Sequence, residues 1–472
     1  MSALVDDLRA ELGPDRVKTG ATELSLYRKD SSNMAGSTAV VCLPETTAEV
    51  QACVRVANRH GVPFVPRGSG TGLSGGAVPL DDAVVIATSK MDRIVSVDEV
   101  NRLAWVQPGL LNLDLSKRLT HLGLHFAPDP SSQQTCSIGG NVANNSGGPH
   151  CLADGVTASH VLGVEVVLPD GTLTVLGGEE PEPAGYDLRG VFVGSEGMLG
   201  ITTSVCVRLT QNAPAVQTLL MDFDTVEAGA ATVSDIIAAG IVPAAVEMMD
   251  QLCLGAVEAY IHAGLPVDSA AALLVEVVGL PHGLELDVER IVEIARSHAV
   301  KDVRVARDDA ERALLWKGRK SAFGAIARIQ PNYYLHDTVV PRSKLPEVLS
   351  QVYEIAARHE LQVLNVFHAG DGNLHPLLLF DARVPGTMER VHEAGEEIVR
   401  ASVEAGGVLS GEHGIGLEKR DYMHLMFSEV DLEAQSALRC AFDPAGLANP
   451  GKVLPSPASC GDIHAVPEGA WI

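Results

Sequence analysis

Hydrophobic and polar residues follow two periods along the chain, and each period predicts one kind of element. From residue 46 to 59 the apolar positions recur at the spacing of one helix face, and Gly61 ends the segment. Residues 110–122 predict another helix. Short apolar runs predict strands at 62–65, 83–88, 94–97, 103–107, 161–167 and 173–176. The polar turns between the third and fourth runs, and between the last two, predict hairpins.

Beyond residue 214, strand and helix patterns alternate. Strands are predicted at 216–222, 271–278, 302–306, 333–340 and 361–367, and helices at 225–239, 285–298, 307–327 and 344–358. A chain of 472 residues is too long for one hydrophobic core. We therefore expect a first domain over 1–212, a second over 213–440 made of one sheet with helices on one face, and a segment over 441–472 whose last part, from 456, is a loosely held tail.

Three stretches rich in small residues interrupt the pattern of the first domain, at 66–79, 129–150 and 194–203. The middle one has almost no charge and no long apolar run, so it predicts neither an amphipathic helix nor a core strand. Its glycine pairs permit close backbone approach, and its Ser, Thr and Asn side chains supply neutral hydrogen bonds. We interpret it as a loop that holds a large polar ligand; the alternative is a flexible linker.

The first stretch contains Gly70-Thr-Gly-Leu-Ser-Gly75, which matches the dinucleotide pattern of glycines after a strand. That pattern requires a helix to follow, but residues 76–82 have neither helical period nor propensity, and Pro79 lies among them. A Rossmann phosphate site is therefore rejected. The interpretation that remains is a nest of backbone N–H groups that faces an anionic pyrophosphate.

Composition excludes several classes of protein. With 60 acidic and 35 basic residues the formal charge is −25, which argues against nucleic acid or anionic membrane as a partner. No apolar segment reaches the roughly 18 residues of a spanning helix, and the N-terminus lacks the pattern of a secretory signal, so a cytoplasmic protein is expected. Eight scattered cysteines without a C-x-x-C pair predict free thiols, with no disulfide framework, zinc ribbon or iron–sulfur cluster.

The most specific chemistry lies near the end of the second domain. His368 and His375 flank a Gly-Asp-Gly-Asn turn, so a hairpin would bring both imidazoles to one point, and Glu412 and His413 lie in a later glycine-flanked turn. Two histidines and one carboxylate form the ligand set of a catalytic divalent metal that keeps an open position. The spacing alone does not distinguish a metal ligand set from histidines that only cap turns, so this alternative stays open.

The three small-residue stretches and these histidines resemble the vanillyl-alcohol oxidase / p-cresol methylhydroxylase superfamily, and within it the D-lactate dehydrogenase and glycolate oxidase branch. The resemblance covers nearly the whole chain. It implies an α+β fold, with a p-cresol methylhydroxylase (PCMH)-type FAD-binding domain of two α+β subdomains and a C-terminal α+β substrate domain that contains an antiparallel sheet. It also implies that residues 441–472 return to the FAD domain.

Members with covalent flavin carry a histidine where this chain has Thr71, so the resemblance implies non-covalent FAD. The residues that it assigns to the cofactor are Pro66, Arg67, Gly68, Ser69, Gly70, Thr71, Gly72, Ser74, Pro128, Ser132, Gly139, Gly140, Asn144, Ser146, Gly147, Gly148, Gly155, Glu196, Gly200, Ile201, Asn449 and Lys452.

The resemblance also implies a metal held by His368, His375 and Glu412, with His413 as the base. Zinc is the first choice, although manganese and iron suit the same nitrogen and oxygen ligands. A 2-hydroxy acid would chelate this metal through its carboxylate and hydroxyl groups. Loss of the hydroxyl proton to His413 and of hydride to flavin N5 would then give the 2-oxo acid. Asn373 is expected to hydrogen-bond the substrate.

Arg319 resembles the arginine that clamps the substrate carboxylate, and the alternative is a solvated helix face beside Lys317 and Lys320. Relatives that prefer dicarboxylates carry Thr and Lys near the positions of Phe323 and Leu335. A short or apolar D-2-hydroxy acid such as D-lactate, or glycolate, is therefore the expected substrate.

Two other functions remain alternatives. One is a flavoenzyme of the same fold that oxidises another alcohol or a sugar; the other is a flavin subunit within a multi-subunit glycolate oxidase complex. Because no cysteine cluster is available for iron–sulfur, electrons must pass to a quinone, a cytochrome, an electron-transferring flavoprotein or an iron–sulfur partner subunit. A homodimer is left open.

Overall fold

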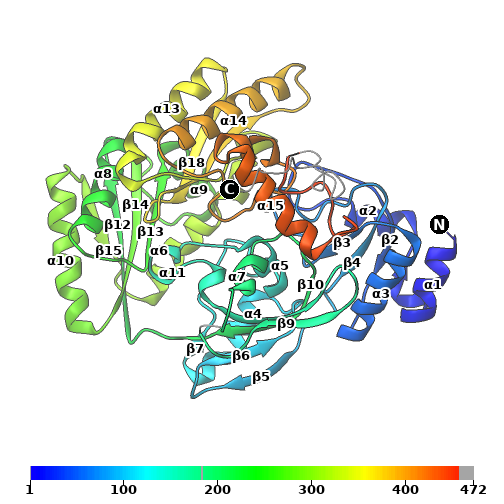
Figure 1. The fold of residues 1–472 in the computed structure, drawn as a ribbon. Helices are drawn as coiled ribbons and strands as arrows, with labels where there is room; N and C mark the ends of the chain where they lie inside the picture. The colour runs from blue at the N-terminus through cyan, green and yellow to red at the C-terminus, as the bar shows by residue number, and fades with distance from the viewer. Residues whose placement is uncertain (1, 182–183, 456–472) are drawn as a thin grey trace. The chain divides into compact units, whose positions relative to one another are not determined.

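The computed structural model describes residues 2–181 and 184–455, which fall into two compact units (Figure 1). Unit 1 holds the described residues up to 147, then 155–212 and those from 412 onward; unit 2 holds 148–154 and 213–411. The chain thus returns to unit 1 earlier than the expected position 441, because hydrogen bonds already hold residues 413–416 there. The tail expected from residue 456 lies outside the described residues.

Unit 1 begins with a four-stranded sheet whose inner strands are parallel. Its strands, in spatial order, are β1 (Val17–Lys18), β2 (Thr38–Cys42), β4 (Ala83–Ala87) and β3 (Phe64–Arg67). The helices of this part are α1 (Ser2–Leu12), α2 (Ala21–Tyr27) and α3 (Thr47–His60). The helix predicted over 46–59 is confirmed as α3, because the Thr46 side chain caps its first turn and Gly61 ends it with φ 62°.

An antiparallel five-stranded sheet forms the second part of unit 1. Its order is β5 (Ile94–Asp98), β6 (Leu103–Val106), β10 (Ile201–Arg208), β8 (Val161–Val167) and β9 (Leu173–Gly177), which confirms both predicted hairpins. The remaining elements are α4 (Asn112–Leu119), α5 (Ile138–Asn144), α7 (Leu188–Phe192), α15 (Glu429–Phe442) and the pair β7 (Leu124–His125) and β11 (Thr210–Gln211).

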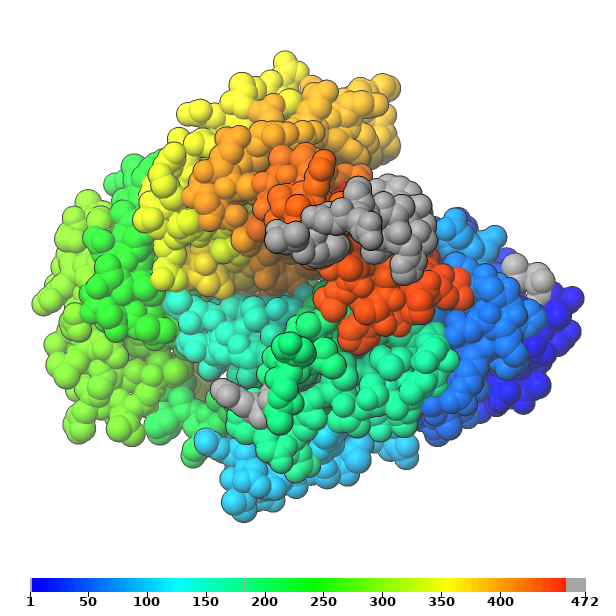
Figure 2. Space-filling view, viewed as in Figure 1, coloured from blue at the N-terminus to red at the C-terminus, as the bar shows by residue number. Residues whose placement is uncertain are grey.

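The C-terminal part of unit 1 packs on its N-terminal sheet. Phe64 of β3 donates its backbone N–H to the carbonyl of Leu447 and forms a parallel bridge with Ala448. Figure 2 shows this red segment against the blue N-terminal residues. Residues near the two ends of the described chain therefore share one core.

Unit 2 is built on a larger antiparallel sheet. Its strands are β12 (Ala215–Phe223), β13 (Ala245–Asp250), β14 (Ala271–Gly279), β15 (Asp302–Val305), β16 (Asn332–Leu335), β17 (Thr338–Val339), β18 (Gln362–His368), β19 (Asn373–Leu374) and β20 (Pro376–Phe380). Its helices are α6 (Cys151–Asp154), α8 (Val226–Ala238), α9 (Gln251–Ile261), α10 (Pro281–Ser297), α11 (Asp309–Lys320), α12 (Ala322–Ile326), α13 (Leu345–Arg358) and α14 (Thr387–Glu404).

The expectation of helices on one face of this sheet is wrong. Val246 and Met248 of β13 share a core with α8, α10, α13 and α14. Successive side chains of a strand alternate, so Glu247 faces the other way. Arg319 of α11 pairs with Glu247 on that opposite face. Helix α11 therefore covers the second face, and it brings charged side chains there.

Other expectations also need correction. The helix predicted over 307–327 is broken at Ser321, where φ −92° and ψ 0° depart from helical values, and the strand predicted over 333–340 is split into β16 and β17. The stretch 129–150 contains α5, because Ser137 caps it and Ile138 and Val142 are buried. The strand β13 and the helix α9 were not predicted.

The prediction of free thiols is wrong at one position, because Cys440 is disulfide-bonded. Spacing could not reveal this, since pairing depends on where the fold places each thiol. Cysteines 42, 53, 136, 206 and 253 of the described chain are free thiols. Within residues 2–181 and 184–455, every helix is too short or too polar to cross a bilayer.

Candidate active site

Strand register places a row of polar side chains on one face of the unit 2 sheet. Glu247 of β13 lies directly opposite His368 of β18, and His368 lies opposite Asn373 of β19. His375 follows Asn373 by two residues, so its side chain is on the same face. The intervening apolar residues Phe367 and Leu374 enter the core on the other face. Backbone pairing alone thus gathers the candidate polar groups.

A tight turn between β18 and β19 brings the two histidines together. Gly372 has φ 79°, and a Cβ at this position would lie 2.2 Å from the carbonyl oxygen of Val340, so a larger residue does not fit. The ring centroids of His368 and His375 are 5.0 Å apart, and the rings are inclined at 78°. The hairpin predicted from the spacing of these histidines is confirmed.

Glu412 follows Gly411, the last residue of unit 2, and completes the cluster. Asp337, fully buried between β16 and β17, accepts hydrogen bonds from the hydroxyl of Ser410 at 2.5 Å and from the N–H of Gly411 at 3.0 Å. Glu412 is the next residue, and ligand atoms of His368, His375 and Glu412 all lie within 4.8 Å of one another. These donors fit a divalent cation with an open position.

Glu247 was not predicted, and it lies behind His368. Its Oε1 is 2.7 Å from Nδ1 of His368, and its Oε2 is 2.5 Å from Nη2 of Arg319. Burial acts to raise the pKa of this carboxyl group, but the charge of Arg319 and the contact with His368 prevail and hold its pKa below the ordinary value. Asp337 was also missed. The only signal for Glu247 was an acidic residue among the apolar residues of β13, and the only signal for Asp337 was an acidic residue between two short strands.

Arg319 is buried, so the alternative of a solvated helix face is wrong for it, although Lys317 is exposed. Nε of Arg319 and Oδ1 of Asn373 are buried atoms without a hydrogen-bond partner among the described residues. Buried polar groups are normally satisfied. A polar ligand would supply the partners that these two atoms lack.

His413 follows Glu412 and belongs to unit 1. Its backbone carbonyl accepts hydrogen bonds from the Ser74 hydroxyl at 2.9 Å and the Asn144 amide at 2.8 Å, and its Nε2 is 3.8 Å from Oε1 of Glu412. Ser74 and Asn144, which the resemblance assigns to the cofactor, thus hold the main chain of His413, the candidate base. Consecutive residues therefore offer a metal ligand and an imidazole.

The first glycine-rich loop follows β3 and leads directly to β4, with no helix between them. This agrees with the rejection of a Rossmann site. Gly70 has φ 73° and Gly75 has φ 80°, values that favour glycine. A Cβ on Gly72 would meet only Asp30 within 4 Å, at 3.9 Å, and one on Gly140 only the Ser137 hydroxyl, at 3.3 Å. Only one side-chain oxygen lies within 4 Å of each of these positions, which fits a cofactor that lies against the backbone.

Three more residues assigned to the cofactor, Glu196, Asn449 and Lys452, make contacts within unit 1. Asn449 donates to the carbonyls of Gly76 and Glu196, and Lys452 donates to the carbonyl of Val78 at 2.8 Å. Burial raises the pKa of Glu196 to about 7, although its carboxylate accepts backbone N–H groups of residues 415 and 416. Burial lowers the pKa of Lys452 to about 8. These groups hold the C-terminal segment on the glycine-rich loop.

The other predicted cofactor residues lie at separate places in the chain. Pro66 and Arg67 end β3; Gly68, Ser69 and Thr71 lie in the loop after it; Pro128 and Ser132 precede α5; Gly139 lies in α5; Ser146 and Gly147 follow it; Gly155 precedes β8; Gly200 precedes β10; and Ile201 begins β10. Ile201 packs in the core of unit 1. Gly148 belongs to unit 2.

Comparison with known proteins shows the family of this chain. A model described as "FAD linked oxidases, C-terminal domain" matches residues 213–453, and one described as "FAD binding domain" matches residues 38–177. The "Glycolate oxidase subunit GlcD" of Escherichia coli (strain K12) is 47% identical over 427 residues, which are 90% of this chain and 86% of that protein. The chain belongs to the FAD-linked oxidase family.

Two more similarities, one to a sequence relative and one to a solved structure, describe this FAD-linked oxidase more closely. The "D-lactate dehydrogenase" of Anaerostipes hadrus is 31% identical over 454 residues, which are 94% of this chain and 95% of that protein. The structure of p-cresol methylhydroxylase with substrate bound superposes with a TM-score of 0.80 at 17% identity, over 96% of each chain. The expected α+β fold with a PCMH-type FAD-binding domain is confirmed, and the protein is an FAD-dependent oxidoreductase.

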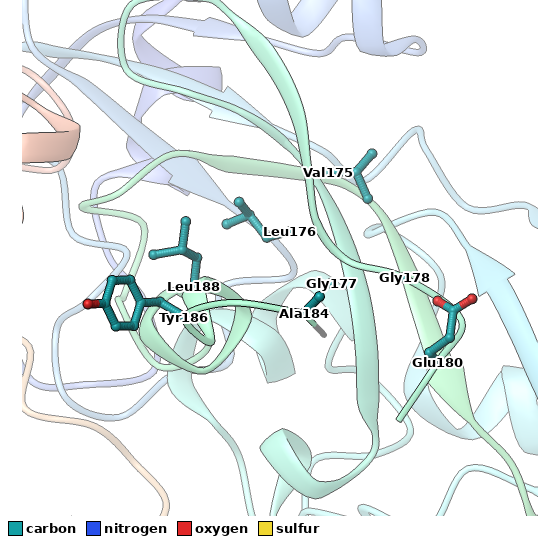
Figure 3. A pocket seen from close by; sticks show the side chains of 8 residues that line it. All are labelled: Val175, Leu176, Gly177, Gly178, Glu180, Ala184, Tyr186 and Leu188. Atoms are coloured by element: carbon teal, nitrogen blue, oxygen red, sulfur yellow. The ribbon is translucent and has the colours of Figure 1, made fainter. Parts of the chain in front are cut away.

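A surface pocket of the oxidase lies apart from the candidate residues. Its volume is about 520 Å³, and Figure 3 shows its lining of Val175, Leu176, Gly177, Gly178, Glu180, Ala184, Tyr186 and Leu188. These residues come from β9 and the segment up to α7. None of the predicted cofactor, metal or catalytic residues contributes to it.

Replacing Gly140 with valine is expected to give folded oxidase that contains little FAD. Within 4 Å the new Cβ would meet only the Ser137 hydroxyl, at 3.3 Å, so we expect the added methyl groups to occupy cofactor space. Gly283→Val is the control, because it places the same side chain in another helix, α10, where a Cβ meets no atom within 4 Å. The measurement is the flavin absorbance of each purified variant relative to protein. Wild-type flavin content in Gly140→Val would contradict the assigned cradle.

Proposed function

We propose that this oxidase converts a short 2-hydroxy acid, D-lactate or glycolate, to the 2-oxo acid with FAD held non-covalently. The names of two relatives, a glycolate oxidase subunit and a D-lactate dehydrogenase, support this substrate class. Thr71 supports the non-covalent mode, because it offers no imidazole for a bond to flavin.

The observation that carries the proposal is the approach of His368, His375 and Glu412 to within 4.8 Å. These side chains would hold a divalent ion, with zinc as the first choice. Oxidation of a simple alcohol or a sugar by flavin does not require such a cluster. A 2-hydroxy acid could bind such an ion through its hydroxyl oxygen and one carboxylate oxygen.

Arg319 and Asn373 would bind the substrate. The guanidinium would take the carboxylate, and the carboxamide of Asn373 would hydrogen-bond the substrate. Phe323 lies 6.4 Å from Tyr333 between ring centroids, and Leu335 is buried. The apolar side chains at positions 323 and 335 offer no charge for a second carboxylate, which favours a monocarboxylate.

His413 would act as the general base. Its neutral imidazole takes the hydroxyl proton as the C–O bond becomes a carbonyl and the hydrogen on the α-carbon leaves with two electrons. When bound, FAD accepts this hydride. A divalent ion, when bound, lowers the pKa of a coordinated hydroxyl group. The one proton and the hydride account for the two hydrogens that separate the hydroxy acid from the oxo acid.

The two electrons must then leave the flavin. In the described part of the chain, His368, His375 and Glu412 form the one group of three or more His, Cys, Asp or Glu side chains that could hold a metal. We infer that the oxidase passes electrons to a quinone, a cytochrome, an electron-transferring flavoprotein or an iron–sulfur partner subunit. The word "subunit" in the name of the Escherichia coli relative favours a partner protein.

An anaerobic panel of substrates tests the function. We expect D-lactate or glycolate to bleach the flavin absorbance of the holoenzyme fastest. L-lactate, a simple secondary alcohol and a sugar should leave it oxidised, and D-2-hydroxyglutarate should react more slowly because of its second carboxylate. Bleaching by the alcohol or the sugar but by no hydroxy acid would replace the proposal with the alternative flavoenzyme.

A further inference from the structure

We propose that Glu247 is a positioning residue that holds the metal ligand His368 with one oxygen and the substrate-binding Arg319 with the other. The inference rests on the proposed function, and it adds a residue to which neither the sequence pattern nor the family resemblance gave a role. All three side chains are almost fully buried, with exposed fractions of 0% for Glu247, 1% for Arg319 and 2% for His368.

The first half of the argument concerns the imidazole of His368. Register places Glu247 and His368 opposite each other on adjacent strands, and Oε1 lies 2.7 Å from Nδ1. A carboxylate at this distance keeps the proton on Nδ1 and leaves the lone pair of Nε2 for a metal. Glu247 therefore selects the tautomer and fixes the ring plane of one ligand.

The second half concerns Arg319. Its Nη2 lies 2.5 Å from Oε2 of Glu247, while its Nε has no hydrogen-bond partner among the described residues. The carboxylate thus compensates the buried charge and anchors one edge of the guanidinium. It leaves a second N–H for a substrate carboxylate. Removing Glu247 would leave a buried charge unpaired.

A purely structural role, docking α11 on the sheet, is already performed elsewhere. Glu276 of β14 accepts two hydrogen bonds from Arg312 at 2.7 and 2.8 Å and one from the indole N–H of Trp316 at 2.6 Å. Both donors belong to α11. The pair of Glu247 and Arg319 is not needed to attach the helix, which points to positioning within the site.

The test compares zinc affinity and substrate saturation in two variants of the FAD-loaded oxidase. Glu247→Leu removes the acceptor, and we expect its zinc affinity, measured by equilibrium dialysis with metal analysis, to fall about 10- to 100-fold. Glu247→Gln keeps an oxygen for Nδ1 of His368 but loses the charge opposite Arg319. It should recover part of the zinc affinity and still show a raised KM for the hydroxy acid.

Asp250→Asn is the matched control. Asp250 is a buried acid at the end of the same strand, and it bonds the backbone N–H groups of Cys253 and Asn365 and the hydroxyl of Tyr353. Its zinc affinity should equal that of the wild type. If Glu247→Leu does not fold, the double variant Glu247→Leu/Arg319→Met is used, because it removes both buried charges. The zinc affinity of the double variant is then compared with that of the wild type.

The outcomes separate this inference from the proposed function. Wild-type zinc affinity in a folded Glu247→Leu or in the double variant overturns the positioning role and leaves the proposed function intact. A wild-type protein that binds no divalent ion overturns the metal mechanism and the positioning role together. An equal loss of zinc affinity in Asp250→Asn would mark the effect as a general loss of packing and overturn the inference.

Discussion

Replacing His413 with alanine is expected to slow flavin reduction roughly 10²- to 10⁴-fold, the usual effect of removing a positioned base. FAD and metal should stay bound. The contacts of His413 with Ser74 and Asn144 use its backbone carbonyl, which alanine retains. Alanine therefore keeps both of these hydrogen bonds. The measurement is the anaerobic rate of flavin bleaching by the best substrate of the panel, followed by stopped flow.

His424→Ala serves as the control for this variant. His424 is exposed in unit 1, and its ring contacts the carbonyl of Asp421 within its own turn. Its rate of flavin reduction should match that of the wild type. If His413→Ala reduces its flavin within about twofold of the wild-type rate, His413 is not the base.

Replacing His375 with alanine should abolish turnover because the metal is lost, while FAD remains bound. The candidate cofactor residues and His375 lie in different units, apart from Gly148, so the flavin content should not depend on this imidazole. Metal analysis and flavin absorbance of the same preparation check both parts of the expectation. His298→Ala is the control, since His298 pairs with Asp235 at the end of α10 and is not in the cluster.

Chelation gives an independent check of the same prediction. If exhaustive chelation, verified by metal analysis, leaves the flavin reduction of the wild type unchanged, the metal mechanism is wrong. The alternative of a flavoenzyme for another alcohol or a sugar would then take its place. Restoration of activity by zinc, manganese or iron would identify the functional ion.

The sequence by itself was sufficient wherever the signal is local. Helix α3 was predicted because its cap Thr46 and its terminator Gly61 adjoin the helix. The convergence of His368 and His375 was predicted because seven residues and one glycine turn determine it. The absence of a helix after the first glycine-rich loop also follows from neighbouring residues. Each conclusion depends on backbone preferences of a few residues, which do not change with the rest of the fold.

Only the tertiary structure decided which side chains complete the site. Glu247 lies on a strand that the sequence did not predict, because the six residues Ala-Val-Glu-Met-Met-Asp are too few to show a clear strand period. Its partner His368 is 121 residues away. The burial of Arg319 and the second helical layer likewise depend on how α11 packs. Strand register and helix docking are set by the burial of many apolar residues together, and this long-range balance leaves no local mark in the sequence.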